Sequence, residues 1–206
     1  MSDALTRFFS NPVIPVVVID DAEQAVPLAE ALLEGGINAI EITLRTAQAL
    51  AAMEAIAKNT PDMLLTAGTA LNAAHLRQVK EAGAQLAVSP GISIELLDTA
   101  KALGLTLLPG IASASELMLG INHGLTHFKL FPASAINGIG LAKAFAGPFP
   151  EARFCCTGGI SEADLSSYLA EPNIPSVGVS WLASRQAISA GDWRGISAAA
   201  RRLAQA

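Results

Sequence analysis

Charged side chains interrupt an apolar run early in the 206-residue sequence, in the segment IEITLR (40–45). In a β-strand, alternate side chains point to opposite faces, so Glu41, Thr43 and Arg45 would share one face. The intervening isoleucines and leucine suit a face that packs on helices, and we therefore expect Glu41 and Arg45 to point inward. Buried charges are costly, and such costs persist mainly at functional sites. An internal Glu–Arg ion pair that only fills the interior is the alternative.

Lys129 lies in the middle of a second apolar run, HFKLFP (127–132), where it would share a strand face with His127 and Phe131. A lysine at the centre of a parallel strand cannot easily extend its ammonium group to water. Loss of hydration favours the neutral amine, which is the form that attacks a carbonyl carbon to make a Schiff base. The position therefore predicts an amine nucleophile. A structural lysine paired with an internal carboxylate is the alternative.

A diglycine, Gly158-Gly159, follows a third strand-like run and precedes a helical pattern. Backbone N–H groups at the start of a helix bind phosphate well, and the hydroxyl of Ser180 after the next run would add a donor. Two further segments of small residues, TAGT (66–69) and SPG (89–91), could offer donors or a close wall to a substrate. A tight turn is the alternative for each of these segments.

The remaining reactive residue types indicate no second chemistry. His75, His123 and His127 have no acidic or cysteine partners at the spacing of metal ligands, so we predict no metal site. Cys155 and Cys156 are adjacent and cannot form an ordinary structural disulfide. We expect both to be buried thiols of a strand.

The rest of the sequence must supply the elements that position these residues. Apolar, β-branched runs alternate with stretches of helical period, and the runs are apolar on both faces, as parallel strands between helices are. We predict one domain over residues 1–206, an α/β fold of the (β/α)8 TIM-barrel type with a short N-terminal helix. The predicted strands cover 13–20, 38–44, 64–69, 86–90, 105–109, 127–131, 153–157 and 177–181. The predicted helices cover 22–34, 47–58, 73–82, 94–103, 115–122, 139–146, 162–169 and 193–204.

The barrel prediction places the chemistry at the carboxyl ends of the strands, with phosphate bound after the seventh and eighth strands. An open doubly wound sheet is the alternative fold, but its G-x-G-x-x-G fingerprint is missing from the first turn, DDA (20–22).

Composition excludes two classes of partner. Thirteen Lys and Arg against 18 Asp and Glu give a net charge of −5, which disfavours nucleic acid as a partner. No run of about 18 apolar residues occurs, so we expect no membrane insertion, and the N-terminal segment lacks a secretory pattern. We expect a cytoplasmic protein. With 51% apolar and 15% charged residues, the chain must bury a large core and could also bury subunit contacts.

Seven motifs together resemble the KDPG/KHG aldolases, the 2-dehydro-3-deoxy-phosphogluconate and 4-hydroxy-2-oxoglutarate aldolases. The resemblance covers almost the whole chain in order and spacing. It implies a class I aldolase on an (α/β)8 barrel that needs neither metal nor cofactor, assembles as a homotrimer and takes small 2-oxo acid or sugar-phosphate substrates. The motifs are EITLR (41–45), AGT (67–69), SPG (89–91), PGI (109–111), SELMLG (115–120), FKLFPA (128–133) and TGGI (157–160).

The resemblance also implies roles for ten residues. Lys129 resembles the Schiff-base lysine of the family, and Glu41 resembles its acid/base. The expected substrate-binding residues are Arg45 and Thr69 at the pyruvyl carboxylate, Pro90 and Phe131 as pocket walls, and Thr157, Gly158, Gly159 and Ser180 toward the phosphate.

Three residues depart from the family pattern. Cys156 replaces a proline, Ser134 a glutamate and Val179 a glycine. Because Ser134 and Val179 are expected near the aldehyde half of the substrate, these departures bear on substrate preference and leave the chemistry of Lys129 and Glu41 intact.

The implied reaction splits 2-dehydro-3-deoxy-6-phosphogluconate into pyruvate and glyceraldehyde 3-phosphate, and also 4-hydroxy-2-oxoglutarate into pyruvate and glyoxylate. A 2-dehydro-3-deoxy-6-phosphogalactonate aldolase, or another sugar-phosphate enzyme on the same barrel such as an isomerase, is the first alternative. A non-catalytic binder of sugar phosphates is the second, because a fold does not guarantee an activity.

Overall fold

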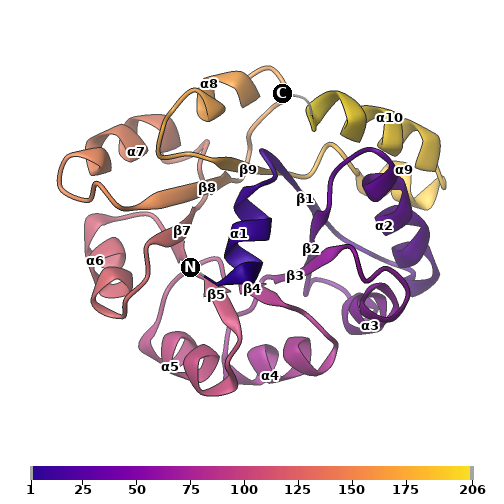
Figure 1. Ribbon diagram of the computed structural model, residues 1–206, viewed down its shortest axis with the longest axis horizontal. Helices are drawn as coiled ribbons and strands as arrows, with labels where there is room; N and C mark the ends of the chain where they lie inside the picture. The colour runs from indigo at the N-terminus through magenta and orange to yellow at the C-terminus, as the bar shows by residue number, and fades with distance from the viewer. Residues whose placement is uncertain (1, 205–206) are drawn as a thin grey trace.

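The computed structural model describes residues 2–204 as a ring of parallel strands surrounded by helices (Figure 1). Strands adjacent in the chain pair with each other, except for β5 and β6, which end the strand order. β1 also pairs with β9, so the sheet curls into a barrel. This confirms the predicted fold class. The strands are β1 (Val13–Val17), β2 (Ala39–Thr43), β3 (Leu64–Gly68), β4 (Leu86–Val88), β5 (Thr106–Leu108), β6 (Gly110–Ile111), β7 (His127–Leu130), β8 (Arg153–Thr157) and β9 (Ser176–Val179).

The described residues form nine strands where eight were predicted, because the fifth predicted strand is broken at Pro109. β5 pairs with β4, and β6 pairs with β7, so these two short strands together join the ends of the sheet. Proline has no N–H group and cannot donate to the ladder. The Pro109 carbonyl still accepts from the Lys129 N–H at 2.9 Å, which ties this segment to β7.

The helices lie outside the ring, except for α1, which crosses one end of it (Figure 1). Two short elements differ from prediction: the first predicted helix is split into η1 (Ala22–Gln24) and α2, and α9 was not predicted. The helices are α1 (Asp3–Phe9), α2 (Ala25–Glu34), α3 (Ala49–Asn59), α4 (Ala73–Glu81), α5 (Ile94–Leu103), α6 (Ala114–Asn122), α7 (Gly138–Ala146), α8 (Leu165–Leu169), α9 (Arg185–Ser189) and α10 (Trp193–Leu203).

α8 begins at Leu165, although the pattern predicted a start at Glu162. The Ser161 hydroxyl donates to the Asp164 carboxylate at 2.6 Å, and the Ser161 N–H donates to the same oxygen at 3.4 Å. Side chains of this kind offer the backbone a local turn in place of a helix. The Ser161–Asp164 contact therefore holds a turn that precedes the helix.

Strand alternation sorts the side chains as predicted. Ile40 and Ile42 on β2, and Phe128 and Leu130 on β7, belong to the large apolar core between the strands and the helices. A second, smaller core fills the inside of the barrel, where inward-facing side chains meet one helix residue, Phe8. Its buried members are Phe8, Ile14, Ala39, Leu64, Leu86, Val88, Leu108 and Cys155.

α1 closes the amino-terminal end of the barrel. Phe8 is fully buried in the inner core, while the Phe9 ring packs at a tilt against His127, with ring centroids 4.8 Å apart. The Asn11 side chain after the helix donates to the Asn38 side chain at 2.9 Å, at the start of β2. The apolar plug therefore closes the inside of the barrel at its amino-terminal end.

Replacing Phe8 with alanine tests the plug. A buried phenylalanine reduced to alanine loses its transfer free energy and leaves a cavity, so F8A should lower the free energy of unfolding by about 3–5 kcal/mol. Urea denaturation at one fixed protein concentration measures the change. Q78A, at an exposed position of α4, serves as the control and should change the free energy by about 0.5 kcal/mol or less. Equal values for the two variants would contradict the role of α1.

Candidate active site

All ten residues predicted to form the site line one cavity of about 260 Å³. They come from β2, β7 and β8 and from the segments that directly follow β2, β3, β4, β7, β8 and β9, so the cavity opens at the carboxyl ends of the strands. Six further residues line it, and of these Val16 and Val18 went unnoticed in the sequence because they are ordinary apolar residues of a predicted strand. The six are Val16, Val18, Thr43, Ile160, Gly178 and Val179.

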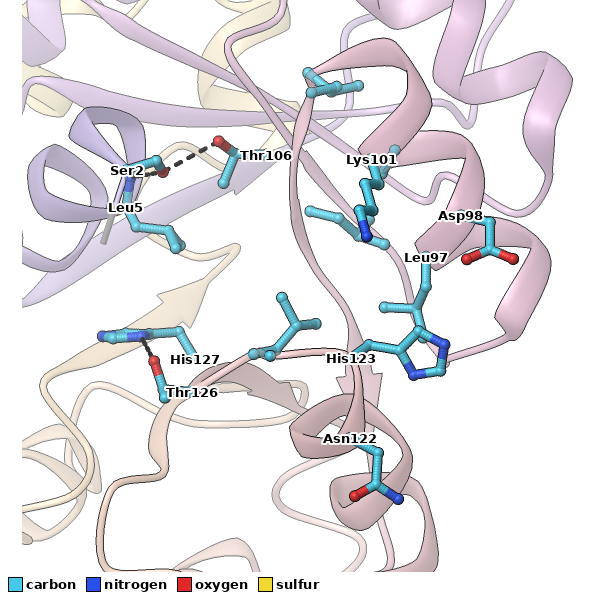
Figure 2. Close-up of a pocket in the computed structure, with 15 residues that line it drawn as sticks. Ser2, Leu5, Leu97, Asp98, Lys101, Thr106, Asn122, His123, Thr126 and His127 are labelled. Carbon is cyan, nitrogen blue, oxygen red and sulfur yellow. Dashed lines mark hydrogen bonds between the residues drawn. The ribbon is translucent and has the colours of Figure 1, made fainter.

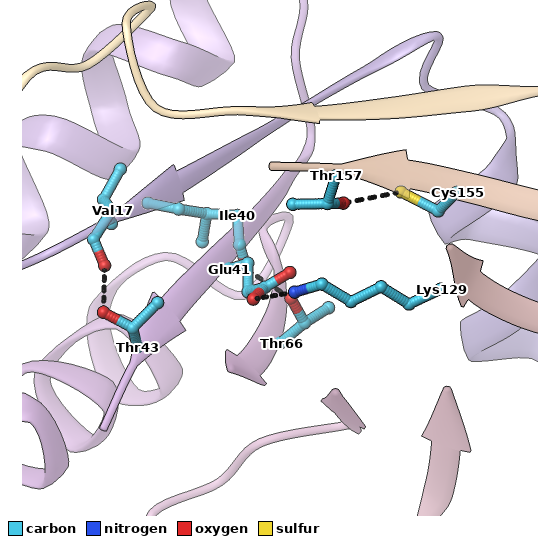
Figure 3. Close-up of polar contacts among 8 residues, drawn as sticks. All are labelled: Val17, Ile40, Glu41, Thr43, Thr66, Lys129, Cys155 and Thr157. Atoms are coloured by element: carbon cyan, nitrogen blue, oxygen red, sulfur yellow. Dashed lines mark hydrogen bonds and ion pairs between the residues drawn. The ribbon is translucent and has the colours of Figure 1, made fainter. Parts of the chain in front are cut away.

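Lys129 and Glu41 meet across the inside of the barrel (Figure 3). The Lys129 Nζ atom donates to Glu41 Oε1 at 3.2 Å, and the two side chains are only 7% and 3% exposed. Their strands, β7 and β2, lie on opposite sides of the ring (Figure 1). The alternative of an internal Glu41–Arg45 ion pair is wrong, because within residues 2–204 Glu41 pairs with Lys129 alone.

The polar side chains next to this pair are occupied elsewhere. The Thr43 hydroxyl donates to the Val17 carbonyl and the Thr66 hydroxyl to the Ile40 carbonyl, each at 2.8 Å (Figure 3). Lys129 Nζ also lies 5.3 Å from the centre of the Phe131 ring, within the range of a cation–π contact. The amine and the carboxylate are therefore each other's principal polar partner.

The charged side chains that line the cavity are Glu41, Lys129 and Arg45, which together carry one net positive charge. Arg45 follows β2 and is exposed at the cavity mouth, where its guanidinium group can bind a carboxylate through two parallel hydrogen bonds. A partly enclosed cavity with a net positive lining favours anionic ligands.

Thr69 has a strained backbone at the cavity wall, with a φ of +64°. A β-branched residue rarely adopts this left-handed conformation, and such strain clusters at functional sites. The segment TAGT (66–69), predicted as either a binding element or a turn, thus supplies a cavity-lining residue in an unusual conformation.

Gly158 and Gly159 also have left-handed conformations, with φ of +105° and +75°. Their loop is tied to the segment after β7, since the Ser134 N–H donates to the Gly158 carbonyl at 2.9 Å. The expectation that the diglycine begins a helix is wrong, because α8 starts only at Leu165. Any phosphate affinity here comes from loop N–H groups and the Ser180 hydroxyl and not from a helix N-terminus.

The three departures from the family pattern lie in different surroundings. Val179 is 3% exposed and belongs to the outer core, so its side chain packs toward the helices. Ser134 lies beside Gly159, since a Cβ atom at Gly159 would be 2.9 Å from the Ser134 Cβ atom. Cys156 is fully buried in the outer core. Of the three, Val179 lines the cavity itself, and Ser134 lies next to its diglycine.

The two cysteines are buried free thiols, as predicted. Cys155 Sγ lies 3.7 Å from the Thr157 hydroxyl (Figure 3), and burial raises the pKa of this thiol to about 12. Burial also raises the pKa of Cys156. Neither thiol is ionised at neutral pH, so neither is a nucleophile there. Within residues 2–204, no three His, Cys, Asp or Glu side chains are grouped so that they could hold a metal ion.

A larger cavity of about 670 Å³ lies at the other end of the barrel, between α1, α5 and the segment before β7 (Figure 2). Lys101, Asp98 and His123 are among its lining residues, and the Thr106 hydroxyl bonds to Ser2 at its edge at 3.1 Å. None of the ten predicted site residues lines it. Because barrel enzymes place their chemistry at the carboxyl ends of the strands, size alone does not make this cavity the active site.

Known proteins match the chain along almost its whole length. The family model described as KDPG and KHG aldolase matches residues 6–199. The chain is 50% identical to the 2-dehydro-3-deoxy-phosphogluconate aldolase of Pseudoalteromonas atlantica, over 94% of this chain and 90% of that protein. It is 48% identical to the KHG/KDPG aldolase of Escherichia coli K12, over 93% and 90% of the two chains.

A solved structure also resembles this one closely. It is that of the KDPG aldolase of Legionella pneumophila with pyruvate captured at low pH as a covalent carbinolamine intermediate. The two structures superpose with a TM-score of 0.95 and 43% identity, over 98% of each chain.

No helix within residues 2–204 of the present chain is both long and apolar enough to span a membrane.

Thiol accessibility provides a direct test of the site's interior. Because both cysteines are buried and their pKa values raised, an aromatic disulfide reagent at pH 8 should titrate essentially no thiol in the native protein. In denaturant it should titrate both cysteines of each chain. Absorbance of the released thiolate measures the count. Rapid reaction of one thiol in the native protein would contradict the packing around Lys129.

Proposed function

Because the chain belongs to the KDPG and KHG aldolase family, we propose that Lys129 and Glu41 carry out class I aldol cleavage in the cavity at the carboxyl ends of the strands. The protein is a lyase. The proposed reaction splits 2-dehydro-3-deoxy-6-phosphogluconate into pyruvate and glyceraldehyde 3-phosphate, and 4-hydroxy-2-oxoglutarate into pyruvate and glyoxylate. The observation that carries the assignment of roles is the buried contact of 3.2 Å between the amine and the carboxylate.

The contact supplies the proton transfers that imine formation needs. A proton passes from the Lys129 ammonium group to the Glu41 carboxylate along their hydrogen bond, which leaves a neutral amine and a neutral acid. The amine attacks the C2 ketone of the substrate to form a carbinolamine. Glu41 then returns its proton to the carbinolamine hydroxyl, which leaves as water, and a protonated imine remains.

The protonated imine accepts the electrons of the bond that breaks. As the C3–C4 bond cleaves, its electron pair moves toward the iminium nitrogen and forms an enamine. The Glu41 carboxylate takes the proton of the C4 hydroxyl, and the aldehyde product departs. Protonation of the enamine at C3, followed by attack of water on the imine carbon, releases pyruvate and restores the Lys129 amine.

The two ends of the cavity fit the two anionic ends of such a substrate. We assign Arg45 and Thr69 to the carboxylate beside the reacting ketone, because both lie on the side of Glu41. We assign Thr157, Gly158, Gly159 and Ser180 to the distal phosphate, where loop N–H groups and a hydroxyl are available. Pro90 and Phe131 form walls between the ends. The distal carboxylate of 4-hydroxy-2-oxoglutarate would use the same donors as the phosphate.

We further propose a cytoplasmic homotrimer that acts in the Entner–Doudoroff type of carbohydrate metabolism. Two unpaired thiols are in keeping with a reducing compartment. Leu71, Ile94 and Met118, on successive βα units, leave 55%, 58% and 53% of their surface exposed, and such large apolar side chains favour contact with another subunit.

Replacing Glu41 with glutamine tests the acid/base role with almost no change of shape. The amide cannot accept the proton, so kcat should fall by a factor of about 10² to 10⁴. Pyruvate release, coupled to NADH oxidation, measures the change. E34Q is the matched control, because Glu34 is 71% exposed and distant from the cavity, and this variant should keep its activity. An E41Q variant within twofold of the wild type would contradict the role of Glu41.

Replacing Ser180 with alanine tests the assignment of the phosphate end. Loss of a hydrogen bond to a charged group costs about 1.5–3 kcal/mol, so kcat/KM for the 6-phosphorylated substrate should fall by roughly ten- to a hundredfold. The loss for a truncated substrate without a distal anion should be small. S166A, at an exposed serine of α8, is the control. Equal losses for both substrates would show that Ser180 acts elsewhere in the reaction.

A further inference from the structure

Gly68, the last residue of β3, lies next to Glu41 at the open end of the barrel. In the pairing of β2 with β3, Gly68 stands opposite Thr43, and its carbonyl accepts from the Leu44 N–H at 2.9 Å. The residue is buried. Its φ angle is not in the left-handed region, so the backbone at this position could accommodate any residue. A need for glycine must therefore come from the space that a side chain would occupy.

The Glu41 side chain fills that space. A Cβ atom at Gly68 would lie 2.2 Å from Glu41 Oε1 and 2.8 Å from its Cδ and Cγ atoms. Carbon atoms in ordinary contact are about 3.5–4.0 Å apart, so Glu41 could not keep its position beside any larger residue. Oε1 is also the atom that accepts the hydrogen bond from Lys129.

A single hydrogen bond from a neighbouring side chain, that of Lys129, is not enough to fix where this carboxylate lies. The hydroxyls of Thr43 and Thr66 donate to backbone carbonyls, and Lys129 is the hydrogen-bond partner of Glu41 within residues 2–204. A glutamate side chain rotates about three bonds, so its terminus needs other constraints. The shape of the surrounding protein supplies these constraints, because the missing side chain of Gly68 leaves a slot that fits the Glu41 carboxylate.

We propose that Gly68 is a positioning residue, whose missing side chain creates the slot that holds Glu41 Oε1 against Lys129 Nζ. This inference rests on the proposed function of Glu41. A methyl group in the slot would push the carboxylate away from Lys129 and from the substrate atoms whose protons it transfers. Displacements of about 1 Å in an active site can cost about 10²-fold in rate. Binding of the substrate carboxylate by Arg45 should change little, because the three atoms nearest to a Cβ atom at Gly68 all belong to Glu41.

Steady-state kinetics of G68A provides the first test. We expect kcat to fall tenfold or more, while KM stays within about threefold of the wild type. Q78A, at an exposed position of α4 away from the cavity, is the control. This control should keep kcat within about twofold. A G68A variant with the kcat of Q78A would overturn the proposal.

Melting temperature in a double-mutant cycle tests the slot itself and does not depend on activity. In the wild-type background G68A should lower Tm by about 3 °C or more, because two groups compete for one space. In the E41A background the slot is empty, so G68A should not lower Tm further and kcat should show no added loss. If G68A alone does not fold, the double variant G68A/E41A still should.

Equal Tm losses in both backgrounds would overturn the proposal, since the clash would then lie elsewhere. The same cycle separates this inference from its premise. An E41A variant with the kcat of the wild type would contradict the proposed function of Glu41 and this inference with it. An inactive E41A beside a fully active G68A would contradict the positioning role alone.

Discussion

The buried contact between Lys129 and Glu41 is the interaction on which the rest of the structure depends. Each group is almost completely removed from water, and removal of a charged group from water costs several kcal/mol even after relaxation. The partners come from strands on opposite sides of the ring, so only a closed barrel brings them together. Two groups in such direct contact can exchange a proton. The free-energy cost of burying them is therefore understandable in an aldolase, which needs a neutral amine and a nearby acid.

The two ends of the barrel have opposite properties, and both serve this contact. At the amino-terminal end, α1 inserts Phe8 into an apolar core, which closes this end of the barrel and keeps water out of its interior. At the carboxyl-terminal end, the strands lead into loops that contribute Arg45, Gly159 and Ser180 to a cavity with a net positive lining. Anionic substrate can therefore approach the pair from one side only. Gly68 completes the arrangement by leaving room for the carboxylate of Glu41.

Much of this structure could be predicted from sequence, because it follows from local periodicity. The alternation in IEITLR and HFKLFP placed Glu41 and Lys129 inside and their apolar neighbours outside, and the family motifs placed all ten site residues around one cavity. Features set by tertiary contacts were missed. The break at Pro109, the late start of α8 and the slot at Gly68 each depend on which atoms lie next to a residue in space. The alternative of a Glu41–Arg45 pair is wrong for the same reason, since the partner of Glu41 is Lys129, which is distant in the sequence.

The most direct measurement of the central claim is reduction of a mixture of the protein and pyruvate with sodium borohydride, followed by intact-mass analysis and peptide mapping. Borohydride reduces an imine to a stable secondary amine, which marks the lysine that formed it. The account predicts one reduced pyruvyl group per chain, located on Lys129, and none on the K129R variant. An unmodified protein that remains folded, or an adduct on a different lysine, would contradict the assignment of Lys129 as the nucleophile.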